Sequence, residues 1–151
     1  MLKPRNLAVL AVVLGGLVAV GYASEGHARP AEGDKAVAPA GATNTIVYYF
    51  HGNQRCTTCR TIEAYASEAV KAAFGGELES GATKWKPTNT DEPGNQHFIE
   101  DFQLFTRSLV LVDEADPKRF KNLEQVWQLV RDKPAFLEYV QEEVRAFRKP
   151  R

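Results

Sequence analysis

Apolar and polar positions recur with two different periods along residues 44–148, and this pattern predicts a mixture of strands and helices. Two short, continuous apolar runs predict buried strands, at Thr45–Phe50 and Ser108–Val112. Apolar residues at helical spacing predict four helices, at Cys59–Phe74, Asn95–Phe105, Leu123–Arg131 and Pro134–Phe147. Weaker patterns predict two further strands, at Ala82–Asn89 and Lys118–Lys121.

Particular residues are expected to define the ends and faces of these helices. Gly75 and Gly76 should end the first helix, because glycine readily adopts the left-handed conformation that closes a helix. Helical spacing gives the second helix one apolar face, made of Phe98, Ile99, Phe102 and Phe105.

The order of the predicted elements indicates the fold class. It is strand, helix, strand, helix, strand, strand, helix and helix. We expect parallel pairing within strand–helix–strand units and an antiparallel hairpin near the C-terminus. This is the order of the minimal thioredoxin-like fold, an α/β fold with a four-stranded mixed sheet flanked by helices. Pro87 cannot donate a ladder hydrogen bond, so we expect its strand at the edge of the sheet.

The N-terminal segment has the pattern of a targeting sequence. Lys3 and Arg5 precede an apolar run of 16 residues at 7–22, whereas a full membrane span needs about 20. This pattern predicts a secretory signal peptide at 1–23, cleaved after Ala23. An uncleaved N-terminal membrane anchor is the alternative.

Residues 24–43 contain Gly, Ala, Pro and isolated charges without periodicity, which is typical of a flexible linker before the domain at 44–148. The whole chain has 19 basic and 19 acidic residues, so its net charge is zero. This balance argues against a nucleic-acid partner, because coating DNA or RNA needs many cationic groups. Two cysteines are too few for a disulfide-dense scaffold or a four-cysteine metal site.

The motif Cys56-Thr57-Thr58-Cys59 follows a predicted strand and opens a predicted helix. Unpaired N–H groups and the positive end of the helix dipole would stabilise a thiolate on Cys56, and Arg55 adds a positive charge beside it. Because the thiolate is the nucleophile, Cys56 is the candidate attacking cysteine. Cys59 lies one turn further along and is the candidate resolving cysteine.

The sequence leaves three interpretations of this motif open. The first is thiol–disulfide exchange with a small-molecule or protein thiol substrate. The second is copper or zinc binding by the two thiols with His51, which ends the preceding strand. The third is a structural staple, although closing so short a loop contributes only about 2 kcal/mol. No Gly-rich flavin or nicotinamide motif of the GxGxxG type is present, so we expect no cofactor.

Several segments together resemble a known family. The strand–CxxC–helix unit looks like thioredoxin-like proteins, and YYFHGNQRCTTCRTIEAY with KNLEQVWQLVRDKPAFLEYVQEEV is similar to a bacterial family of small exported members. That family is commonly labelled a nitrophenyl compound nitroreductase subunit of arsenic-resistance operons. The resemblance implies a location in the bacterial periplasm or cell envelope. It also implies an accessory redox subunit that works with a membrane redox partner or permease; whether the chain is itself an oxidoreductase stays open.

The sequence departs from ordinary thioredoxins opposite the motif. The family normally has a cis-proline directly before the third core strand, where this chain has Thr106 and Arg107. A cis bond without proline costs about 2.5–4 kcal/mol, so we expect a trans peptide here. The resemblance places Thr106 and Arg107 near the dithiol, where Arg107 could stabilise a Cys56 thiolate or hold an anion. His51, Arg55, Thr106 and Arg107 are therefore the candidate binding residues.

Overall fold

The computed structural model describes residues 42–150. The predicted signal peptide or anchor at 1–23 lies outside these residues, and so does the predicted linker at 24–43 except for its last two positions. Within residues 42–150, no helix combines the length and the apolar character that crossing a membrane requires.

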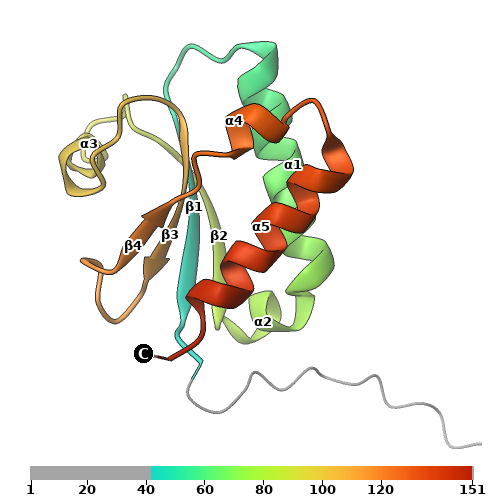
Figure 1. Cartoon of the computed structure of the whole chain (residues 1–151). Helices are drawn as coiled ribbons and strands as arrows, with labels where there is room; N and C mark the ends of the chain where they lie inside the picture. Colours follow the sequence, from blue (N-terminus) through green and yellow to red (C-terminus); the bar gives the residue numbers. More distant parts are fainter. Residues whose placement is uncertain (1–41, 151) are drawn as a thin grey trace, which may run out of the picture. The chain divides into compact units, whose positions relative to one another are not determined.

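Strands and helices alternate along the described residues (Figure 1). The strands are β1 Thr45–His51, β2 Thr83–Asn89, β3 Ser108–Asp113 and β4 Phe120–Asn122. The helices are α1 Thr57–Ala73, α2 Gly75–Ser80, α3 His97–Asp101, α4 Val126–Leu129 and α5 Lys133–Phe147.

The strands form one mixed sheet in the order β2-β1-β3-β4. β1 pairs in parallel with β2 and antiparallel with β3, and β3 pairs antiparallel with β4. This arrangement confirms the predicted α/β fold class, a minimal thioredoxin-like fold with a four-stranded mixed sheet. Pro87 lies in β2, which is an edge strand as predicted.

The pairing of β3 corrects one expectation. Parallel pairing was expected for both strand–helix–strand units, but only β1-α1-β2 follows it. A parallel crossover must return the chain along the length of a strand, about 23 Å for seven residues. The five-residue helix α3 spans only about 8 Å, so β3 enters the sheet at the end where β2 leaves it and runs in the opposite direction.

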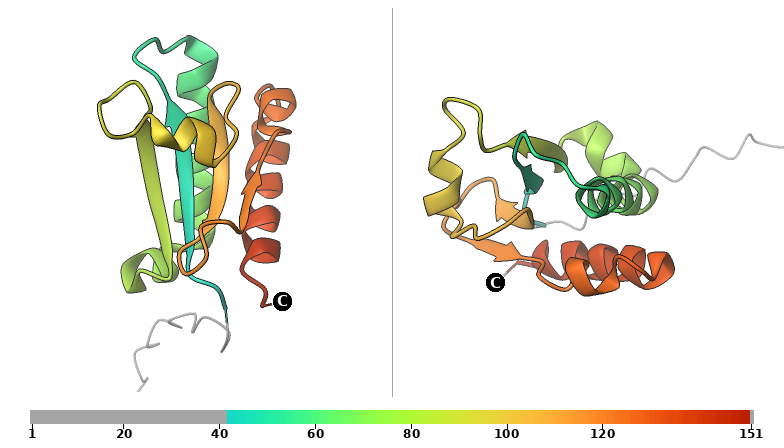
Figure 2. Two further views of the ribbon diagram at one scale, coloured as in Figure 1. Left: turned by 90° about the vertical axis from the view of Figure 1, so that its left-hand side faces the viewer. Right: turned by 90° about the horizontal axis from the view of Figure 1, so that it is seen from above.

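Helices cover the two faces of the sheet unequally (Figure 2). The long helices α1 and α5 lie side by side on one face and enclose the larger core, with fully buried residues such as Val47, Ile62, Leu111 and Phe136. The other face carries the short helix α3 and a smaller aromatic cluster, which includes Tyr48, Phe50 and Phe102. β1 and β3 contribute to both cores because their alternate side chains point to opposite faces.

The helix before β3 is shorter than its apolar pattern predicts. The second predicted helix, Asn95–Phe105, is the five-residue helix α3. Gln103 adopts a left-handed backbone with φ 51°, which takes the chain out of the helix before Phe105. Phe105 is therefore 97% exposed, and Ile99 is 42% exposed, so neither completes the buried face that helical spacing suggested.

The two glycines after the first helix also behave differently from the expectation. α1 ends at Ala73, and Gly75 and Gly76 form the first turn of the short helix α2 instead of only ending α1. A left-handed glycine, Gly81 with φ 79°, lies at the end of α2. It directs the chain into the edge strand β2.

The different burial of Phe102 and Phe105 gives a stability prediction. Phe102→Ala empties part of the smaller core and should lower the free energy of unfolding by about 3–5 kcal/mol. Phe105→Ala removes an exposed ring and should change it by less than about 0.5 kcal/mol. Urea unfolding of the domain at 42–150 within the whole chain measures both. Equal losses for the two variants would show that a longer helix buries both rings.

Candidate functional site

The dithiol motif lies where β1 passes into α1. Cys56 is the N-cap of α1, with an extended backbone at φ −75° and ψ 166°, and its sulfur accepts the N–H of Cys59 at 3.2 Å. Cys56 and Cys59 form a disulfide, with their Cα atoms 5.2 Å apart. The predicted position of the motif, after a strand and at a helix start, is confirmed. The helix begins two residues earlier than predicted, at Thr57.

The two cysteines differ in exposure. Cys56 is exposed at the helix N-terminus, whereas Cys59 is only 4% exposed and belongs to the buried face of α1. A molecule that approaches from solvent therefore meets the sulfur of Cys56. The buried Cys59 can take part in a reaction mainly through its disulfide bond to Cys56.

A shallow groove of about 380 Å³ contains the disulfide. Its lining residues come from the loop before α1, the first turn of α1, the segment before β3, and α4: Gln54, Arg55, Cys56, Cys59, Thr106, Arg107 and Trp127. Three of the predicted binding residues, Arg55, Thr106 and Arg107, thus line one groove with both cysteines. They come from segments that are about 50 residues apart in the sequence.

Hydrogen bonds hold both the side chain and the backbone of Arg107 at this groove. Its Nη2 donates to the backbone oxygen of Gln54 at 2.9 Å, which ties the segment before β3 to the loop before the dithiol. The Nε1 of Trp127 donates to the backbone oxygen of Arg107 at 3.1 Å. The Nε of Arg107 is buried and has no hydrogen-bond partner among the described residues. The peptide bonds of residues 42–150 are all trans, as predicted for Thr106 and Arg107.

Arg55 has a different environment. Its guanidinium forms an ion pair with Glu63, which lies on the next turn of α1 beyond Cys59. Both side chains are partly buried, at 28% and 24% exposure. Glu63 therefore neutralises much of the charge of Arg55, while Arg107 has no ion-pair partner in residues 42–150.

Tyr49 holds the dithiol motif against the sheet, a role that the sequence did not predict. Its hydroxyl donates to the backbone oxygen of Cys59 at 2.6 Å in a buried contact between β1 and α1. Burial raises the pKa of Tyr49, and the positive charges of Arg55 and Arg107 oppose that rise. The alternation of β1 was an available signal, because Tyr49 lies two residues after Val47 and so faces α1 and α5.

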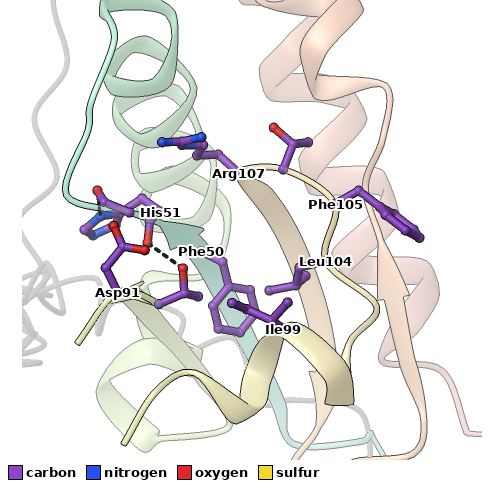
Figure 3. Close-up of a pocket in the computed structure, with 10 residues that line it drawn as sticks. Phe50, His51, Asp91, Ile99, Leu104, Phe105 and Arg107 are labelled. Carbon is purple, nitrogen blue, oxygen red and sulfur yellow. Dashed lines mark hydrogen bonds between the residues drawn. The ribbon is translucent and has the colours of Figure 1, made fainter. Parts of the chain in front are cut away.

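His51 lies outside the dithiol groove. It lines a neighbouring pocket of about 160 Å³ together with Asp91, Ile99 and Leu104 (Figure 3). Its Nδ1 is 3.1 Å from the backbone oxygen of Gly52. Thr106 and Arg107 line both hollows, so the pocket and the groove adjoin. The exposed ring of Phe105 points away from the pocket.

The arrangement gives no third ligand to the two thiols. Among residues 42–150, no three His, Cys, Asp or Glu side chains gather as a metal site would require. His97 is exposed on α3, with its Nε2 3.9 Å from Asp101. The copper or zinc interpretation, which needed His51 beside the cysteines, therefore gains no support from the described residues.

A network of polar contacts holds the loop that leads to Cys56. The backbone N–H of Asn53 donates to the Asp91 carboxylate at 2.7 Å, and the Asn89 amide donates to the Asn53 side chain at 2.8 Å. A Cβ at Gly52 would lie 2.7 Å from the Asp91 carboxylate oxygen, so a larger residue there would displace this carboxylate. The loop after β2 thus positions the loop after β1, and with it Cys56.

Comparison with protein-family models, with curated proteins and with solved structures finds no match to this chain. Its function is therefore inferred from the dithiol groove, its polar supports and the sequence.

Proposed function

We propose that this chain is an exported thioredoxin-like thiol–disulfide redox protein, which serves as an accessory redox subunit with a membrane partner. The observation that carries the proposal is the disulfide between an exposed N-cap cysteine and a buried cysteine at the start of α1. This arrangement favours reaction at one sulfur, with the second sulfur held ready to complete the exchange.

The local charges favour a thiolate on Cys56 in the reduced protein. α1 is 17 residues long, and its positive N-terminal end lies at Cys56. The first turn of α1 contains no acidic residue, so nothing within it offsets this charge. Arg107 adds an unpaired guanidinium in the same groove. A larger thiolate fraction makes Cys56 the better nucleophile.

The proposed exchange transfers two electrons in two steps. In the oxidising direction, a substrate thiolate attacks the sulfur of Cys56, the Cys56–Cys59 bond breaks, and Cys59 leaves as a thiolate that takes a proton from water. A second substrate thiolate then attacks the substrate sulfur of the mixed disulfide and releases Cys56. The products are a substrate disulfide and the reduced dithiol, so the protein needs a further redox partner to restore its disulfide.

Two features of the sequence support an exported protein with a membrane partner. The predicted signal peptide or anchor at 1–23 would place the dithiol in a compartment where disulfides persist. The resemblance described above implies a membrane permease or redox partner that could reset the dithiol. The same resemblance is the basis for a proposed link to nitro-compound reduction or arsenic resistance.

Cysteine variants test the proposed exchange directly. Wild-type protein in glutathione buffers of graded potential should convert reversibly between a disulfide and a dithiol, as counted by thiol alkylation and mass spectrometry. Cys59→Ser should accumulate a mixed disulfide between Cys56 and glutathione, because the resolving thiol is missing. Cys56→Ser should form at least tenfold less mixed disulfide, because Cys59 is buried.

The opposite pattern would contradict the assignment of roles. A mixed disulfide on Cys59 in Cys56→Ser, at the level seen on Cys56 in Cys59→Ser, would show that the two sulfurs are equally accessible. A disulfide that glutathione buffers cannot open would favour the structural staple.

Tyr49 is expected to position the dithiol when the disulfide opens. Its hydroxyl contacts the backbone of Cys59 and not either sulfur, so this contact can persist in the reduced protein. The contact fixes the first turn of α1 on β1. It therefore keeps Cys59 in place for resolution while the bond between the sulfurs is broken.

Tyr49→Phe tests this contact by stability and its dependence on pH. Loss of the hydrogen bond should lower the free energy of unfolding by about 1 kcal/mol at neutral pH in both redox states. The raised pKa in the folded protein means that the neutral phenol stabilises the fold below its ordinary value of 10.0, and that this contribution is lost as pH rises further. Unfolding of the variant should therefore depend less on pH above 10 than that of wild type. Identical stabilities and pH profiles would contradict the contact.

A further inference from the structure

The charged side chains that line the dithiol groove are all positive. Its lining includes two guanidinium groups, those of Arg55 and Arg107, and no carboxylate. From this geometry we infer that the groove takes a low-molecular-weight thiol or disulfide that carries a carboxylate, with the carboxylate on Arg107 and the sulfur at Cys56. This inference rests on the proposed thiol–disulfide exchange and specifies its substrate class.

Arg107 is the group that can bind the carboxylate. Arg55 already has a partner in Glu63, whereas Arg107 has no acidic side chain within ion-pair distance among the described residues. Its bond to Gln54 uses Nη2 and leaves further N–H groups of the guanidinium for a ligand. A carboxylate is the acceptor that a guanidinium binds best.

The position of Arg107 is set before any ligand binds. The contacts to Gln54 and Trp127 hold its side chain and its backbone, so little conformational entropy is lost when an anion arrives. An exposed arginine without such contacts would have to be ordered by the ligand. Arg60 is an arginine of that kind, because it lies exposed on α1 and does not line the groove.

Neither of the acidic groups next to the groove, Glu63 and Asp91, lines it. Glu63 pairs with Arg55, and the Asp91 carboxylate, in the neighbouring pocket, accepts the N–H of Asn53. The N-terminal end of α1 adds a positive potential at Cys56. An anionic thiol is therefore attracted at its reactive end and at its carboxylate, whereas a cationic thiol is repelled at both.

The smallest probe of this class is 3-mercaptopropionate. Its thiolate attacks the sulfur of Cys56, the protein disulfide breaks, and Cys59 leaves as a thiolate and takes a proton from water. A second molecule of the probe then attacks the probe sulfur of the mixed disulfide. Two probe thiols become one dithiodipropionate, and the protein disulfide becomes two thiols, so two electrons pass to the protein.

Three thiols that differ in charge test the inference. The rate at which each opens the disulfide is measured at low salt and divided by its thiolate concentration, for 3-mercaptopropionate, neutral 2-mercaptoethanol and cationic cysteamine. Wild type should react with the anionic thiolate about fivefold faster than with the neutral one, and more slowly with the cationic one. Raising the salt concentration should reduce the preference.

Matched variants test whether Arg107 causes the preference for the anionic thiolate. Arg107→Gln should abolish it, and Arg107→Lys, which keeps the charge, should retain part of it. Arg60→Gln removes the same charge close to the motif but outside the groove, and should keep the wild-type ratio. The ratio between two thiols in one variant cancels any change in the reactivity of the disulfide itself.

The possible outcomes distinguish a failure of the carboxylate site from a failure of the proposed exchange. Equal corrected rates for the three thiols, or equal loss of preference in Arg107→Gln and Arg60→Gln, would overturn the carboxylate site while leaving thiol–disulfide exchange intact. A disulfide that none of the three thiols opens would overturn both.

Discussion

The dithiol depends above all on one contact between the sheet and the helix. The Tyr49 hydroxyl on β1 binds the backbone oxygen of Cys59 on α1, at the point where the chain leaves the sheet. Because β1 pairs with both β2 and β3, this contact fixes the first turn of α1 to the centre of the sheet. Cys56 then caps the helix at the exposed end, and Cys59 faces the core. The difference between the two sulfurs follows from this placement.

Two arginines complete the site, Arg55 from the loop after β1 and Arg107 from the segment before β3. The segment before β3 brings Arg107 to the groove, because β3 pairs antiparallel with β1 and begins at the end where β1 stops. Glu63 on α1 neutralises Arg55, which leaves Arg107 as the cation available to a thiolate or an anionic substrate. Thr106 and Arg107, in the segment that leads into β3, are joined by trans peptide bonds.

Some parts of this site could be predicted from the sequence because their signals are local. The apolar runs of β1 and β3, the edge position of Pro87 and the start of a helix at the CxxC motif depend on neighbouring residues. Other parts depend on distant segments. The bond from Arg107 to Gln54 spans 53 positions, and the approach of Asp91 to Gly52 joins two loops. The left-handed Gln103 shortened α3 against a clear helical pattern, and His51, the last residue of β1, lines the neighbouring pocket and not the dithiol groove. The pattern of apolar residues along a chain does not predict such contacts.

In the proposed exchange, Cys56 is the reactive sulfur and Cys59 the protected one. The most direct measurement is alkylation of the reduced wild-type chain by limiting iodoacetamide near neutral pH, followed by mass spectrometry of the two cysteines. Label should appear on Cys56 at least tenfold faster than on Cys59, since exposure and the helix N-terminus both favour a Cys56 thiolate. Equal rates at the two cysteines, or faster labelling of Cys59, would contradict it.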